Sequence, residues 1–151
     1  MVAMTGLLCV VVFSNCGPRV EEVPFGELDP ARHCEVYFLR SGAPPSGFNL
    51  RNGSFYLTDP DQIAKLKARW RLTSESGPTA CGSEYTVYML EDGKPVNVVN
   101  INGPCGYLET SSGWFDFDTL LYEEIDRSSM QGIGQDKVDS LYVVLSALFG
   151  P

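Results

Sequence analysis

The sequence predicts an α+β fold: an antiparallel sheet of about five or six strands with roughly one to three helices packed mainly on one face. Segments with strand character outnumber helical ones, and several are joined by turns too short for a parallel crossover. About 135 residues follow Cys16, which suits one compact core. The content of 44% hydrophobic and 11% aromatic residues excludes a disordered chain. We therefore expect a single globular domain over residues 32–151.

Six segments are expected to form strands: residues 34–40, 53–57, 84–90, 95–101, 106–110 and 114–117. Asp92-Gly93 separates the third segment from the fourth and is the kind of two-residue turn that favours a hairpin. Ser111-Ser112-Gly113 separates the last two segments and predicts a second hairpin. The two hairpins together would supply most of the sheet.

The clearest helical segment follows Asp59. Asp59 can cap the helix, Pro60 suits its first position, and Gln62 completes the pattern of a capping box. Three apolar residues at helical spacing are expected to face the core: Ile63, Leu66 and Trp70.

Two further segments have helical character. Asp118 can cap a short helix over residues 119–125. Residues 138–149 predict a helix, although their β-branched content leaves a strand open as the alternative. In the helical interpretation four residues would point inward: Leu141, Val144, Leu145 and Leu148.

The chain begins with an uncharged apolar run over residues 4–13. Ten residues of α-helix rise only about 15 Å, roughly half of the hydrocarbon core of a bilayer, so the run cannot span a membrane. Its length is that of the apolar region of a signal peptide. The run ends at Phe13-Ser14-Asn15-Cys16.

Phe13-Ser14-Asn15-Cys16 resembles the lipobox of bacterial lipoproteins. The resemblance covers residues 1–16 and implies that a signal peptide, residues 1–15, is removed and that the thiol of Cys16 is lipidated. It also implies an exported protein anchored to a membrane of the bacterial cell envelope. Two alternatives stay open: an ordinary secretory signal, giving a secreted or periplasmic protein, and a buried N-terminal strand.

Residues 16–31 are expected to contain the lipidated Cys16 followed by a flexible linker. Residues 17–31 include three prolines and two glycines, which disfavour regular secondary structure. Two or three acyl chains on Cys16 would anchor the domain stably to the membrane through this linker.

Cysteine spacing predicts one disulfide. Once the signal is removed and Cys16 is acylated, three cysteines remain, so one bridge and one thiol are expected. Cys81 and Cys105 lie at the open end of the first hairpin, one residue out of register, and a β-bulge would absorb that residue. We predict a bridge between Cys81 and Cys105, worth about 3.5 kcal/mol for a loop of about 25 residues. An unoxidised pair is the alternative. Cys34 would be free, and its redox state is left open.

The candidate chemistry is sparse, and we predict no enzymatic activity, no metal site and no cofactor. The formal net charge of −8 opposes binding to nucleic acid or to anionic lipid head groups. His33 is the only histidine and is expected at the surface. Asp116 and Asp118 alternate with phenylalanines, as on a strand that turns its acids toward solvent.

Two classes of function remain. We favour a non-catalytic binding protein of the cell envelope with an unidentified protein partner, such as an inhibitor or immunity protein. Tyr88 and Trp114 would form its binding face, because Tyr and Trp are enriched at protein interfaces. The alternative is a small envelope hydrolase or metal-binding protein that uses Asp116 and Asp118. A deep pocket around these acids would favour that alternative.

Overall fold

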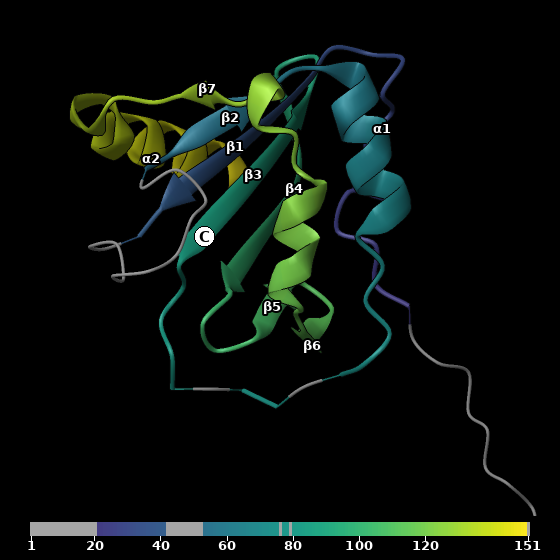
Figure 1. Ribbon diagram of the computed structural model, residues 1–151. Helices are drawn as coiled ribbons and strands as arrows, with labels where there is room; N and C mark the ends of the chain where they lie inside the picture. The colour runs from purple at the N-terminus through teal and green to yellow at the C-terminus, as the bar shows by residue number, and fades with distance from the viewer. Residues whose placement is uncertain (1–20, 42–52, 76, 79, 151) are drawn as a thin grey trace, which may run out of the picture.

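The computed structural model describes residues 21–41, 53–75, 77, 78 and 80–150. Its strands are β1 (Cys34–Arg40), β2 (Phe55–Leu57), β3 (Tyr85–Glu91), β4 (Lys94–Asn102), β5 (Tyr107–Thr110), β6 (Gly113–Asp116) and β7 (Gln131–Gly132). Its α-helices are α1 (Pro60–Arg69) and α2 (Gln135–Phe149), and its 3₁₀ helices are η1 (Thr119–Glu124) and η2 (Arg127–Ser129). Figure 1 shows a twisted sheet with helices on both sides.

The strands form one antiparallel sheet in the order β6-β5-β4-β3-β1-β2-β7. This confirms the α+β class and all six predicted strand segments, although the described part of the chain contains seven strands. The additional strand, β7, pairs through two residues with the outer edge of β2. A two-residue strand is too short to show the apolar alternation from which strands are predicted.

The β3–β4 hairpin contains the predicted bulge. Next to the turn, Leu90 pairs with Pro95, whereas one step further along the hairpin Met89 pairs with Asn97. The register therefore shifts by one residue between Met89 and Leu90. This shift brings the two ends of the hairpin into the register that places Cys81 opposite Cys105.

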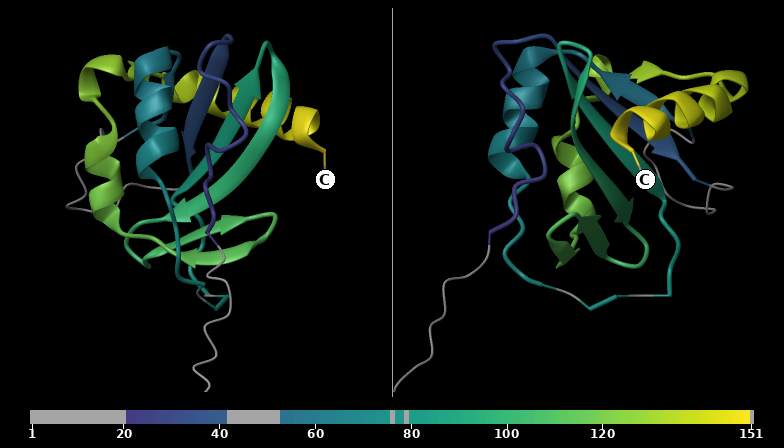
Figure 2. Two further views of the ribbon diagram at one scale, coloured as in Figure 1. Left: turned by 90° about the vertical axis from the view of Figure 1, so that its right-hand side faces the viewer. Right: turned by 180° about the vertical axis from the view of Figure 1, so that it is seen from behind.

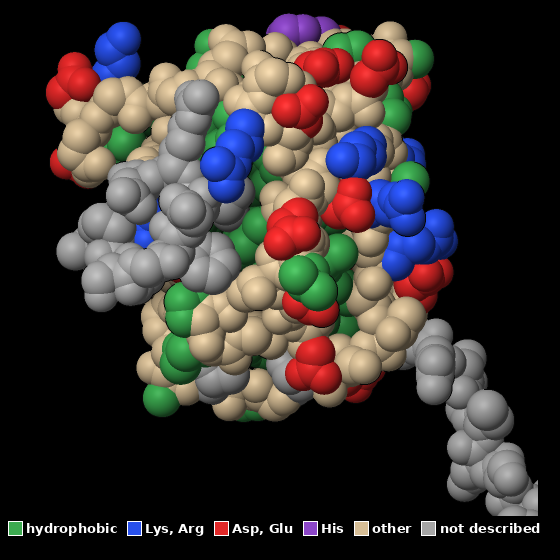
Figure 3. Space-filling view, in the orientation of Figure 1, with side chains coloured by type: hydrophobic (Ala, Val, Ile, Leu, Met, Phe, Trp, Pro, Cys, Tyr) green, Lys and Arg blue, Asp and Glu red, His purple; other side chains and the backbone are tan. Residues whose placement is uncertain are grey.

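The α1 face of the sheet covers the larger core. Trp70, which follows α1, is fully buried, and its ring lies 5.1 Å from that of Phe25 and 5.4 Å from that of Phe117, measured between centroids. Ile63 and Leu66 are also fully buried, so the predicted apolar side of α1 is confirmed. In Figure 3, Lys and Arg side chains gather beside α1, while hydrophobic side chains show only as small separate areas.

Residues 21–31 pack onto this core, and the prediction of a flexible linker is wrong for them. Phe25 and Leu28 are fully buried against the α1 side. Glu22 forms a β-bridge with Leu72 through two backbone hydrogen bonds of 2.8 and 2.9 Å. Prolines and glycines do disfavour helix and strand here, but two large apolar side chains are enough to fix an irregular segment onto the core.

The α2 face is covered more thinly. α2 lies behind the sheet, on the side opposite α1 and the N-terminal segment (Figure 2). Thus α1 and η1 share one face, as expected, but α2 covers the other. Residues 138–149 are helical, which excludes the strand interpretation. Leu145 is buried as predicted, whereas the inward orientation expected of Val144 and Leu148 is wrong: they are 56% and 47% exposed.

The helix caps follow the sequence, with one exception. Asp59 accepts a hydrogen bond from the backbone N–H of Asp61 at 3.0 Å, and Asp118 accepts one from that of Leu120 at 2.9 Å. Gln62 does not complete a capping box. Its buried side-chain amide instead donates to the carbonyl of Glu124 and accepts from the backbone N–H of Asp126, both at 2.9 Å. Gln62 therefore joins α1 to the segment that follows η1.

Candidate binding surfaces

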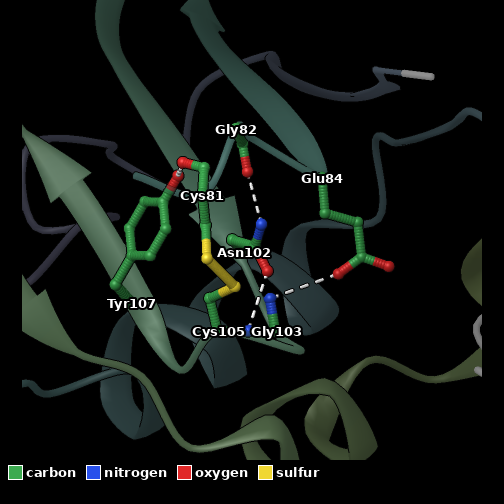
Figure 4. Close-up of a disulfide and its surroundings, with 7 residues drawn as sticks. All are labelled: Cys81, Gly82, Glu84, Asn102, Gly103, Cys105 and Tyr107. Atoms are coloured by element: carbon green, nitrogen blue, oxygen red, sulfur yellow. Dashed lines mark hydrogen bonds between the residues drawn. A yellow bond between two sulfur atoms is a disulfide. The ribbon is translucent and has the colours of Figure 1, made fainter. Parts of the chain in front are cut away.

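The predicted disulfide closes one end of the sheet (Figure 4). Cys81 and Cys105 are bridged, with their Cα atoms 6.5 Å apart. The amide of Asn102 donates to the carbonyl of Gly82 and accepts from the backbone N–H of Cys105, and the hydroxyl of Tyr107 donates to the carbonyl of Cys81 at 2.7 Å. The two segments that enter and leave the hairpin are therefore fixed to each other by covalent and polar contacts.

Cys34 is free, as predicted, and buried. Its thiol donates to the carbonyl of Asp29 at 3.2 Å. Burial, with the nearby carboxylate of Glu91, raises the pKa of the Cys34 thiol, so it is poorly suited to act as a nucleophile. His33, beside it, is exposed as expected. The neighbouring Cys34 and His33 therefore show no arrangement suited to catalysis.

Asp116 and Asp118 are exposed, as strand alternation predicts. The carboxylate of Asp118 caps η1, which gives it a structural role. Within the described ranges there is no group of three or more His, Cys, Asp or Glu side chains that could hold a metal ion.

The two aromatic residues predicted to form a binding face, Tyr88 and Trp114, do not lie on one exposed surface. Tyr88 is only 3% exposed, because α2 covers it. Its hydroxyl shares a 2.7 Å hydrogen bond with that of Ser146, and its ring contacts Tyr142 and Phe149. Trp114 is half-buried against the ring of Tyr107 and lies three strands away from Tyr88, about 14 Å at ordinary strand spacing. The prediction of Tyr88 as an exposed anchor is therefore wrong.

The structure exposes a different apolar surface, on the outer side of α2. Val143 and Val144 are 68% and 56% exposed, and Leu148 follows one turn later at 47%. With the exposed Ala147 they form one stripe, which we name the α2 apolar face. The outer side of a helix on a soluble domain normally carries charge. The sequence signal that could have revealed this face is the absence of any charged residue over 140–150.

Comparison with known protein families, curated proteins and solved structures finds no match to this chain. Among the residues that the structure describes, no helix has both the length and the apolar character needed to cross a bilayer. The fold and its exposed surfaces are therefore the basis for a functional proposal.

Proposed function

We propose that this protein is a lipid-anchored binding protein of the bacterial cell envelope that recognises a protein partner through the α2 apolar face and catalyses no reaction. The observation that supports it most is the α2 apolar face itself. Val143, Val144 and Leu148 are all at least 47% exposed on a stretch of helix without charge. Exposed apolar patches that lie together mark interaction sites on soluble domains.

Two features support a place in the cell envelope. The lipobox-like Phe13-Ser14-Asn15-Cys16, which lies outside the described residues, would be cleaved and acylated during export. The Cys81–Cys105 disulfide is typical of proteins in an oxidising compartment. Neither feature depends on the α2 apolar face, so the anchor and the binding surface can be tested separately.

The packing of the N-terminal segment favours a protein over the bilayer as occupant of the α2 apolar face. Because Glu21 pairs with Arg71 and Glu22 forms a β-bridge with Leu72, only the four residues between Cys16 and Glu21 would serve as the tether, and five residue steps span at most about 18 Å. Arg71 and Leu72, to which Glu21 and Glu22 are bonded, directly follow Trp70 and α1. The tether would therefore leave the domain beside α1, whereas α2 lies on the opposite side of the sheet (Figures 1 and 2). A short tether would therefore turn α2 away from the membrane.

The anchor is tested by Cys16→Ser in the native host. We expect the variant to move from the membrane fraction to the soluble envelope fraction and to lose the acyl mass that mass spectrometry detects on Cys16. Membrane association that persists in the variant, together with a wild-type Cys16 without acyl chains, would contradict the anchor.

The binding surface is tested by site-specific photo-crosslinking in intact cells. A photoreactive residue at position 144 should form adducts with one discrete protein, while the same residue at position 64, exposed on α1, should not. Val144→Asp should abolish the adduct formed from position 148. It should also abolish the phenotype, measured as the ability of the protein to complement a strain that lacks it. Ala64→Asp should preserve both. Adducts with lipid only, or equal adducts from both helices, would contradict the proposal.

The hydrolase or metal-binding alternative is tested in the same assay. Asp116→Asn and Asp118→Asn should leave the phenotype intact. If either abolishes it in a folded protein while Val144→Asp is silent, the binding proposal should be replaced by the alternative.

A further inference from the structure

The exposed apolar side chains of this domain are concentrated on one helix. In the described part of the chain five large hydrophobic side chains are exposed, and four of them lie within residues 142–148 of α2. They are Tyr142, Val143, Val144 and Leu148, at 45%, 68%, 56% and 47% exposed. Tyr142 does not belong to the α2 apolar face, so the exposed apolar surface of α2 is wider than that face. We name residues 142–148 the α2 ridge.

These side chains extend most of the way around the helix. Because an α-helix turns by about 100° per residue, Tyr142 and Leu148 lie about 240° apart across the solvent side, with Val143 and Val144 between them. The remaining arc of about 120° is centred on Leu145, which is buried against the sheet. The right panel of Figure 2 shows α2 with no other described element over its outer side. The α2 ridge is therefore convex and carries apolar side chains on its crest and on both flanks.

Charged residues mark one end of the α2 ridge. Asp136, Lys137 and Asp139 are exposed on the first half of α2, whereas residues 140–150 contain no charged residue. Protein interfaces have an apolar centre and a polar rim. The change from charged to apolar residues within one turn before Tyr142 therefore places the rim of the contact at Asp139 and its centre on the ridge.

The shape of the α2 ridge decides which occupant can cover it. A flat surface, or the α2 helix of a second copy lying alongside, contacts one side of a helix and would leave either Tyr142 or Leu148 in water. A second copy also carries the same formal net charge of −8, which opposes self-association. A groove contacts a helix on its crest and on both flanks, which is how grooves receive amphipathic helices. A groove is therefore the surface that complements the ridge.

We propose, resting on the proposed function, that the protein partner receives the α2 ridge in a single apolar groove. Val143 and Ala147, on the crest, face the floor of the groove, and their short side chains let the backbone of α2 approach it closely. Tyr142 and Leu148 face opposite walls. The walls are apolar and uncharged, because a charge buried against the ridge would find no counter-charge over residues 140–150.

The test extends photo-crosslinking in intact cells to the second flank of the helix. A photoreactive phenylalanine derivative replaces Tyr142 and keeps an aromatic ring against that of Tyr88. In separate variants it replaces Val144 or, as the control, the exposed Ala64 of α1. We expect positions 142 and 144 to form adducts with the same protein, at two different segments of its chain identified by mass spectrometry. Position 64 should form none.

The outcomes separate the groove from the proposed function. Adducts from position 144 without adducts from 142, or adducts from both at a single partner segment, would overturn the groove and leave the proposed function in place. Adducts from both positions with a second copy of this chain would also overturn the groove. No adduct from either position would contradict the proposed function itself. Circular dichroism checks the fold of each variant, and if the variant at 142 does not fold, the exposed position 139, one turn earlier on the same flank, replaces it.

Discussion

The two faces of the sheet are built differently. Among the described residues, 22 buried side chains form the core on the α1 face, whereas four form the cluster under α2: Leu39, Tyr88, Leu90 and Leu145. Since hydrophobic stabilisation scales with the apolar area removed from water, the α1 face supplies most of the stability of the domain. The α2 face contributes less to stability and leaves apolar surface available for contact.

The two helices differ in the same sense. α1 begins with Asp59 as a capping side chain and Pro60 at its first turn. α2 begins after Gly134 without a side-chain cap, and only Val138 and Leu145 of its 15 residues are buried. Elements with few buried contacts and weak caps open at lower free energy than the rest of a fold. α1 is therefore part of the scaffold, and α2, the less firmly packed helix, is the element to which the proposed function assigns binding.

The largest expected effect is that of Trp70→Ala. It removes a fully buried ring from a cluster of aromatic side chains and should lower the free energy of unfolding by about 3–5 kcal/mol. Urea unfolding followed by circular dichroism measures this loss. Trp114→Ala, at the half-buried tryptophan of the edge strand β6, is the control and should cost less than half as much. Equal losses would contradict the assignment of stability to the α1 face.

Removal of the disulfide comes next. The double variant Cys81→Ser, Cys105→Ser separates the two chain segments at the open end of the β3–β4 hairpin, whose strands contribute side chains to both faces of the sheet. It should lower the free energy of unfolding by about 3.5 kcal/mol. Thermal unfolding of oxidised wild type and variant measures the difference. Unchanged stability would show that the polar contacts of Asn102 and Tyr107 suffice.

Leu145→Ala tests the weaker face. Leu145 is buried beside Tyr88, and its truncation should cost about 2–3 kcal/mol, at the low end for a buried leucine because the thin layer of α2 can settle onto the sheet. Hydrogen exchange should show faster exchange in α2 while the amides of β3 and α1 keep their protection. Faster exchange throughout the domain would mean that α2 and the main core open as one unit.

The smallest expected effect on stability is that of Val144→Ser. Val144 is 56% exposed, so the free energy of unfolding should change by about 0.5 kcal/mol or less. Leu66→Ser, at a fully buried position of α1, is the contrast and should prevent stable folding or lower stability severely. A large loss from Val144→Ser would show that the α2 apolar face belongs to the core of the domain and is not free for binding.

Local patterns in the sequence were sufficient for much of the fold. Alternation located β1 and the two hairpins, Asp92-Gly93 located a turn, and the spacing of Cys81 and Cys105 predicted both a bridge and a bulge. These features depend on residues close in sequence, or on counting along one hairpin. The predictions about surfaces did less well. Tyr88 was expected at a binding face and lies under α2, and Val144 was expected inside and lies outside.

The sequence by itself determined the α+β class, the caps at Asp59 and Asp118 and the pairing of Cys81 with Cys105, because each follows from backbone geometry over a short stretch of chain. Only the tertiary structure decided which side of each helix or strand packs against another element of the fold. It placed Phe25 in the core although its segment is rich in Pro and Gly, because burial depends on what packs from elsewhere in the chain. It also placed Arg40 against Glu84, 44 residues apart in sequence, because adjacent strands of the sheet bring β1 and β3 together.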